Sequence, residues 1–269
     1  KERGGDKMHD YFYHNLGQTL TLTGTDGADL NLQPTEELAF AGAHLYAYSY
    51  IYDKKSATTD KDIKATFTIA MPDKDDISMN LWMKGETDRE VFTALSPMTE
   101  GLSRTPGMPY NIKEQPTLTF VARQKGEAWN RPFVAIYEPS SVKEPGCIAE
   151  VKSKTENSAT GICVVQKNGR TDYILSSDNP TDICTSGKMS AQATYALWGN
   201  KKGDDCTFFL GHGTLLSTPN VVIKAETPAD VLLEFKKGAW HYTASADCTI
   251  SIKKKTYQLK ANTEEKILK

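Results

Sequence analysis

Seven consecutive residues near the N-terminus carry side chains that could take part in chemistry: His9, Asp10, Tyr11, Phe12, Tyr13, His14 and Asn15. Because side chains alternate along an extended strand, the odd-numbered residues share one face and the even-numbered residues share the other. Tyrosine rings offer flat apolar faces on which sugar rings stack, and tyrosine and histidine can act as acid or base. The odd-numbered face therefore predicts one wall of a sugar-binding cleft. The alternative is an inner sandwich strand whose rings fill the core.

The same alternation argues against a metal site within this strand. Asp10 and His14 share a face, but four residues of extended chain separate them by ~13 Å, which is too far for one ion. The five cysteines lie far apart with no Cys-x-x-Cys pair, so they do not predict a zinc site. Their positions favour buried small hydrophobic side chains over disulfides. We expect no cofactor in this chain.

A second group of candidates lies in residues 117–139, where two strand-like runs flank a Gly-containing connection. The arginine guanidinium is a planar fork that matches a carboxylate or a sulfate, and a tryptophan ring can stack on a sugar. The alternative is that these arginines pair with nearby glutamates at the surface while the tryptophan caps the core. Together, the two stretches supply the candidate carbohydrate-binding residues His9, Tyr11, Tyr13, His14, Arg123, Trp129 and Arg131.

Short alternating segments rich in Thr, Val, Ile, Tyr and Phe recur along the chain, punctuated by Gly, Pro, Asn and Asp. The clearest element is a hairpin over residues 161–176, because Asn168 and Gly169 between two such runs suit a type I′ turn. Residues 43–52, with tyrosines at alternate positions, predict a further half-buried strand. These patterns predict an all-β fold, with a large antiparallel β sandwich or supersandwich over residues 1–214 and a small C-terminal β sandwich over residues 215–269.

Composition excludes several classes of protein. Hydrophobic residues make up 39% of the 269 residues and charged residues 25%, and no run approaches the ~20 apolar residues that would cross a membrane. A formal charge of −2 provides no general attraction for nucleic acid, so an anionic ligand would need local positive charge. The run Lys253-Lys254-Lys255 is interpreted as a solvated turn, with attraction of an anionic polymer as the alternative.

Two stretches of the chain resemble parts of the β region of heparinase II/III-like polysaccharide lyases. Residues 8–17 are similar to an aromatic, histidine-containing strand of that family, and residues 126–139 are similar to a later segment. Their order and spacing fit, and the resemblance extends over essentially the whole chain. It implies an enzyme that cleaves uronic-acid polysaccharides by β-elimination, with an N-terminal α-helical toroid, a central antiparallel β supersandwich and a small terminal β domain.

The resemblance also implies that the chemistry resides elsewhere. In such enzymes the catalytic Tyr, His and Asn come largely from the helical domain, and the metal ligands lie upstream of the matched strand. We therefore expect the C-terminal β part of a lyase, inactive or nearly so without the missing N-terminal helical domain, with an anionic polysaccharide as its ligand. A divalent metal in the full-length protein and a periplasmic or extracellular location are expectations from the resemblance alone. The alternative is a stand-alone, non-catalytic carbohydrate-binding or interaction sandwich.

Overall fold

The computed structural model describes residues 7–38, 46–99, 104, 106, 114–126, 131–156, 159–201, 206–253 and 255–268. In this part of the chain, regular structure consists of antiparallel strands and one short 3-10 helix, η2, at Tyr46–Tyr50. The prediction of an all-β fold is confirmed. None of the described helical structure is long and apolar enough to cross a membrane. The chain divides into two compact units, Lys1–Gly146 (unit 1) and Cys147–Lys269 (unit 2).

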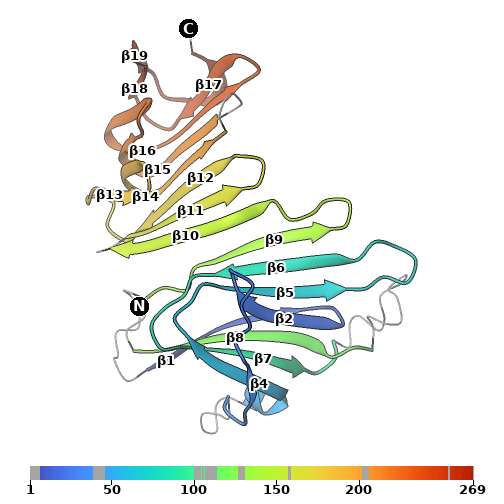
Figure 1. The fold of residues 1–269 in the computed structure, drawn as a ribbon. Helices are drawn as coiled ribbons and strands as arrows, with labels where there is room; N and C mark the ends of the chain where they lie inside the picture. The colour runs from blue at the N-terminus through green and yellow to red at the C-terminus, as the bar shows by residue number, and fades with distance from the viewer. Residues whose placement is uncertain are drawn as a thin grey trace. The chain divides into compact units, whose positions relative to one another are not determined.

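Unit 1 contains two antiparallel sheets (Figure 1). The five-stranded sheet has the order β1-β8-β7-β4-β3, formed by β1 Met8–Asn15, β8 Thr117–Lys125, β7 Arg89–Ser96, β4 Tyr52–Thr59 and β3 Gln33–Pro34. The four-stranded sheet has the order β2-β5-β6-β9, formed by β2 Thr19–Gly24, β5 Ile63–Ile69, β6 Ile77–Met83 and β9 Ala135–Ser141. Strands β1 and β9 are therefore edge strands of their respective sheets.

The two sheets of unit 1 enclose its main core. Phe67 and Leu81 from the four-stranded sheet pack in one cluster with Val91, Phe120 and Ala122 from the five-stranded sheet, and all five are fully buried. The alternating apolar residues of β5 explain this packing, because every second side chain of the strand points to the same face. Unit 1 is thus a sandwich whose inner faces carry the apolar members of each strand.

The outer face of the five-stranded sheet carries a second, smaller core. Phe92 and Val121 point to this face and are covered by Leu38 and Ile51, with Tyr48 packed alongside. Strand β8 is therefore covered on both faces, which explains its nearly continuous run of buried residues. Residues 46–50 form η2 rather than the predicted strand, because a compact turn brings one of their tyrosines down onto the sheet.

Unit 2 is built on one large antiparallel sheet of eleven strands (Figure 1). Its strands are β10 Ile148–Glu156, β11 Ala159–Gln166, β12 Thr171–Ser177, β13 Cys184–Ser186, β14 Met189–Asn200, β15 Cys206–Ser217, β16 Val221–Lys236, β17 Ala239–Ala244, β18 Cys248–Ile252, β19 Lys255–Leu259 and β20 Asn262–Ile267. The predicted Asn-Gly hairpin is the β11–β12 pair. Its turn is not the predicted type I′, which needs a positive φ at both central residues, because Gly169 has a positive φ of 85° and Asn168 does not. None of the five cysteines forms a disulfide bond.

Long strands allow the sheet of unit 2 to fold over itself. The first part of β16 pairs with β18, and its last part pairs with β17, with shifts of register between β15 and β16 near Gly213. The two parts enclose a core that includes Leu210, Leu233 and Ile250. The predicted boundary between residues 214 and 215 falls inside β15, which hydrogen-bonds to a neighbour on each side. The register between β15 and β16 is irregular near this point, and the compact units divide at Gly146.

Candidate functional site

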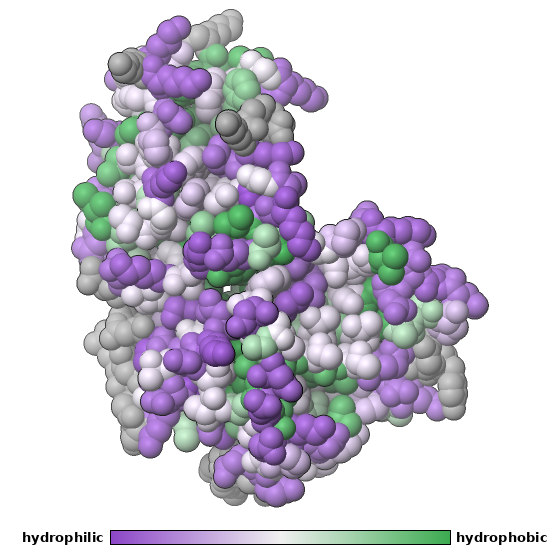
Figure 2. Space-filling view, viewed as in Figure 1, coloured by the Kyte–Doolittle hydropathy of each residue, from purple (hydrophilic) through white to green (hydrophobic). Residues whose placement is uncertain are grey.

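The described side chains on the face shown in Figure 2 are mostly hydrophilic, and the hydrophobic ones form small separate patches. On this face, local pockets rather than a broad apolar surface are the places to look for a ligand. In unit 1, one such pocket lies at the end of the aromatic strand β1 and includes its last residue, Asn15.

The register of β1 decides what its side chains can reach. Tyr11 lies opposite Ala122 of β8, and Tyr13 lies opposite Phe120, so both tyrosines face the interior of the sandwich. Both are only half-buried, because β1 is an edge strand and one side of each ring remains accessible. Each ring therefore packs against the core with one side, as the alternative predicted, and leaves its other side accessible, as a cleft wall requires.

A tyrosine on β9 completes a group of three rings, Tyr11, Tyr13 and Tyr137, which we call the tyrosine cluster. The hydroxyls of Tyr11 and Tyr137 are hydrogen-bonded to each other, and the ring centroids of Tyr13 and Tyr137 lie 5.0 Å apart. The Asn15 amide donates a hydrogen bond of 3.2 Å to the Tyr13 hydroxyl. Because β1 and β9 are the edge strands of different sheets, the cluster spans the open edge of the sandwich. Tyr137 is 46% exposed there.

The protonation of the tyrosine cluster favours binding over catalysis. Burial raises the pKa of Tyr11 above its ordinary range, and the hydrogen bond with Tyr137 raises it further. Burial is also the largest cause that raises the pKa of Tyr13, and only its hydrogen bond with Asn15 acts in the opposite direction. Both phenols therefore stay protonated at neutral pH. They can stack on a sugar or donate a hydrogen bond, but neither is prepared to remove a proton.

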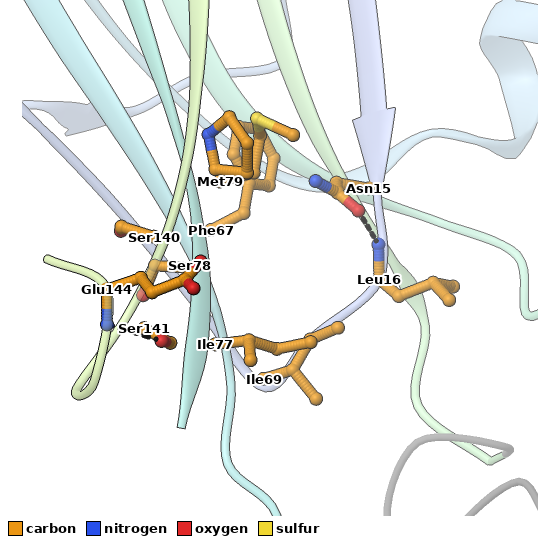
Figure 3. A pocket seen from close by; sticks show the side chains of 11 residues that line it. Asn15, Leu16, Phe67, Ile69, Ile77, Ser78, Met79, Ser140, Ser141 and Glu144 are labelled. Carbon is orange, nitrogen blue, oxygen red and sulfur yellow. Dashed lines mark hydrogen bonds between the residues drawn. The ribbon is translucent and has the colours of Figure 1, made fainter. Parts of the chain in front are cut away.

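The pocket beside the tyrosine cluster has a volume of about 440 Å³ (Figure 3). Asn15 and Leu16 lie on one side, and Ser140, Ser141 and Glu144 lie on the other. The Ser141 hydroxyl accepts a hydrogen bond of 3.0 Å from the backbone of Glu144, which holds that turn in place. The remaining lining residues give the pocket a largely apolar floor: Phe67, Ile69, Ile77, Ser78, Met79 and Pro139. An apolar floor with a few polar groups at the rim is typical of a small-ligand site.

Arg89, the first residue of β7, lies at the other end of the same inner face, and Arg131, on the segment that precedes β9, lies near it; we call these two arginines the arginine end. Arg89 is fully buried, and its guanidinium lies 4.6 Å from the ring centroid of Phe133, which in turn packs against Tyr11. Arg131 is partly exposed and forms a 3.5 Å ion pair with Glu86. Burial lowers the pKa of Arg89 to about 10, so it still carries its charge at neutral pH. Glu86 also pairs with Lys84 at 3.3 Å, so the arginine end carries a positive charge that this carboxylate offsets in part.

Two buried polar atoms at the arginine end have no hydrogen-bond partner among the described residues: one terminal nitrogen of Arg89 and Nε2 of His9. His9 lies opposite Gln124, whose side-chain oxygen accepts a 3.1 Å hydrogen bond from Arg89. Leaving a buried donor unpaired is costly, so such atoms mark places where water or a ligand group is expected.

The remaining described candidates, His14 and Arg123, belong to the outer face of the five-stranded sheet. Arg123 forms a two-pronged ion pair with Asp10, with both nitrogen–oxygen distances 2.8 Å, and Tyr48 donates a 2.7 Å hydrogen bond to the same carboxylate. His14 Nδ1 lies 2.9 Å from the Thr119 hydroxyl, and burial lowers its pKa. The structure thus separates these two candidates from the tyrosine cluster. Trp129 lies outside the described residues.

Sequence reasoning did not single out Tyr137, Phe133 or Arg89. The first two lie within the second predicted stretch and share the alternation of an inward-facing strand, which is the signal that could have found them. Arg89 carried no such signal, because nothing in the sequence distinguishes a buried arginine from an exposed one. Within the described residues, no group of three or more His, Cys, Asp or Glu side chains is placed to hold a metal ion.

Comparison with known proteins connects the chain to polysaccharide lyases. Residues 148–235, which lie within unit 2, match the family described as the endo-acting ulvan lyase C-terminal domain. The chain is also 30% identical over 234 residues to the endo-acting ulvan lyase of Formosa agariphila. That alignment covers 82% of this chain and 27% of the relative, so the chain spans about a quarter of that protein. Both similarities are to ulvan lyases, and neither names the heparinase II/III-like family.

Proposed function

We propose that this chain is the C-terminal β part of a polysaccharide lyase and that the tyrosine cluster forms part of the wall that holds the polysaccharide. The observation that carries the proposal is the convergence of β1 and β9. These edge strands of two sheets bring three tyrosines together between a pocket and the arginine end. Stacking rings beside positive charge suit an anionic sugar chain. Ulvan, the polysaccharide named for the relative, is the first ligand to test.

The finer proposal is a heparinase II/III-like enzyme that cleaves uronic-acid polysaccharides by β-elimination. That reaction needs a base to remove the proton at C5, an acid for the leaving oxygen and a group that neutralises the uronate. In the tyrosine cluster, the raised pKa values supply hydrogen-bond donors but no base. A helical domain of the full-length protein would supply the missing groups, and any divalent metal of the enzyme would be held by ligands upstream of the matched strand. A periplasmic or extracellular location belongs to the same proposal.

A non-catalytic carbohydrate-binding module is the second candidate, and the same raised pKa values favour it, because they describe a site built to bind. The two candidates differ in what a change at the tyrosine cluster does to catalysis by the full-length protein. In a lyase wall, the change lowers turnover of bound polymer. In an independent module, the change lowers retention on the polymer and leaves turnover of short oligosaccharides intact.

The first test measures binding of ulvan by this chain with affinity gel electrophoresis, together with ultraviolet absorbance for unsaturated products. We expect retention without turnover. Tyr137→Ala should weaken retention about fivefold, because loss of one stacking ring costs roughly 1 kcal/mol. Tyr52→Ala removes a tyrosine that is similarly exposed, at 48%, and lies on β4 away from the cluster. Equal retention of the two variants would overturn the proposed wall, and turnover by the chain alone would place the catalytic groups within it.

A further inference from the structure

Unit 2 contains a pocket of about 250 Å³ that the tyrosine cluster does not involve. Four aromatic rings form its walls: Trp198, Phe208, Phe235 and Trp240. They come from four neighbouring strands and form a continuous series, with ring centroids 6.2 Å apart for Trp198 and Phe208, 6.1 Å for Phe208 and Trp240, and 5.1 Å for Phe235 and Trp240. The pocket is open to solvent, and two of its rings, Phe235 and Trp240, are only half-buried, so a ligand can reach them.

The mouth of the pocket is polar and positively charged. Asn200, Asn220 and Lys253 line it together with the aromatic walls. Among the described residues, neither side-chain amide has a hydrogen-bond partner, and the lysine has no ion pair. The donors and the charge at this mouth are therefore available to a ligand.

Backbone hydrogen bonds hold the two turns that carry Asn220 and Lys253. The backbone N–H of Lys253 donates a 3.1 Å hydrogen bond to the carbonyl of Asn220, which ties together the two turns at the mouth. Thr218 and Val221 brace the first of these turns with reciprocal hydrogen bonds of 2.8 to 3.1 Å. Lys253 also adopts a positive φ of 44°, a conformation unusual for lysine. The backbone of these turns therefore loses little freedom on binding.

We infer that this pocket binds the terminal residue of an anionic oligosaccharide, an inference that rests on the proposed polysaccharide ligand. The aromatic walls match the apolar face of a sugar ring, the two amides match its hydroxyls, and the ammonium of Lys253 matches a carboxylate or sulfate. The inner end of the pocket is closed by Trp198 and Phe208, which are 7% and 3% exposed. A chain end can enter such a pocket, whereas the middle of a polymer cannot pass through it.

β-Elimination creates suitable chain ends, because each cleavage leaves an unsaturated uronate at the new non-reducing end. The ring of that residue is flattened and carries a carboxylate, so it fits a narrow aromatic slot with a lysine at the mouth. Unit 2 would then retain the enzyme on fragments that it has just produced. The family match of residues 148–235 includes Trp198, Phe208 and Phe235, while Trp240 and Lys253 lie beyond it.

The test titrates the whole chain with an unsaturated tetrasaccharide prepared by lyase digestion of ulvan, using calorimetry and tryptophan fluorescence. Lys253→Gln should weaken binding about tenfold or more, because a charge-assisted hydrogen bond is lost. Lys188→Gln removes an exposed turn lysine elsewhere in unit 2 and should leave binding unchanged. Neutral cellotetraose should not bind. Equal affinities of the two lysine variants, or equal binding of the neutral sugar, would overturn the inference.

The tyrosine variants separate this inference from the proposed function. Tyr137→Ala should weaken retention on intact ulvan and leave tetrasaccharide binding to unit 2 unchanged. If intact ulvan binds but the tetrasaccharide does not, the end-binding pocket is refuted and the proposed function stands. If the tetrasaccharide binds and Tyr137→Ala has no effect on intact ulvan, the proposed wall is refuted instead.

Discussion

Replacing Asp10 by asparagine would remove the carboxylate that is hydrogen-bonded to the nearly buried guanidinium of Arg123. The Asp10 carboxylate accepts two 2.8 Å hydrogen bonds from Arg123 and one of 2.7 Å from Tyr48. The two charged side chains are only 11% and 10% exposed. In the Asp10→Asn variant, one of the two acceptor oxygens becomes an NH₂ group that faces the donors of Arg123. The arginine then loses both its charge partner and one of its acceptors.

The expected loss is a large part of the stability of unit 1. Removing one partner of a buried ion pair costs about 3–5 kcal/mol, and the residual exposure of this pair favours the lower end, about 3 kcal/mol. For a domain of this size, each kcal/mol lowers the unfolding midpoint by roughly 2–4 °C, so a decrease of roughly 6–12 °C is expected. Differential scanning calorimetry of the whole chain would measure it as a shift of the transition that belongs to unit 1.

Two further variants show whether the ion pair is the cause. Glu36→Gln removes a fully exposed carboxylate that lies 3.6 Å from Lys54, and it should leave the midpoint nearly unchanged, because an ion pair with a fully solvated partner contributes little. The double variant of Asp10→Asn with Arg123→Met removes both charges and should be more stable than Asp10→Asn alone. A decrease for Asp10→Asn no larger than that for Glu36→Gln would refute the reasoning. If the folded double variant loses affinity for ulvan, Arg123 also contributes to binding.

Three other predictions concern protonation, backbone space and thiol reactivity. Burial lowers the pKa of His14 below 6.5, so as the pH falls below about 6.5 the unfolded state takes up the proton first and stability decreases. His14→Asn should flatten this dependence of the unfolding midpoint, and an unchanged slope would contradict the assignment. Gly17 and Gly27 both have positive φ, but only at Gly17 would an added Cβ lie 2.4 Å from a main-chain oxygen. Gly17→Ala should therefore lower the free energy of unfolding, measured with denaturant, by roughly 1–3 kcal/mol more than Gly27→Ala does. Cys147 is exposed, whereas burial raises the pKa of Cys248, so a thiol reagent should modify Cys147 first, and similar rates for the two in the folded protein would contradict the structure.

Local sequence patterns gave much of the fold because they report local geometry. Alternation predicted strands such as β5, and the Asn-Gly pair predicted the β11–β12 hairpin, since both signals depend only on residues that are close together in the sequence. The same signal failed over residues 46–50, where alternating tyrosines form a 3-10 turn. An alternating pattern only favours a strand. Here the 3-10 turn is formed instead, because it packs Tyr48 onto the apolar outer face of the five-stranded sheet.

The sequence alone determined that Tyr11 and Tyr13 share a face, because the side-chain period of a strand is two residues. It could not determine that Tyr137, 126 residues from Tyr11, would meet them at the open edge of the sandwich. Nor could it decide that Arg123 would be matched by Asp10 across the β1–β8 register, with its guanidinium turned to the outer face. Those outcomes depend on which strands become edges and how sheets pair, and these are properties of the tertiary structure. The sequence therefore gives the chemical character of each side chain in the candidate site, whereas the pairing of distant strands determines which of these side chains come into contact.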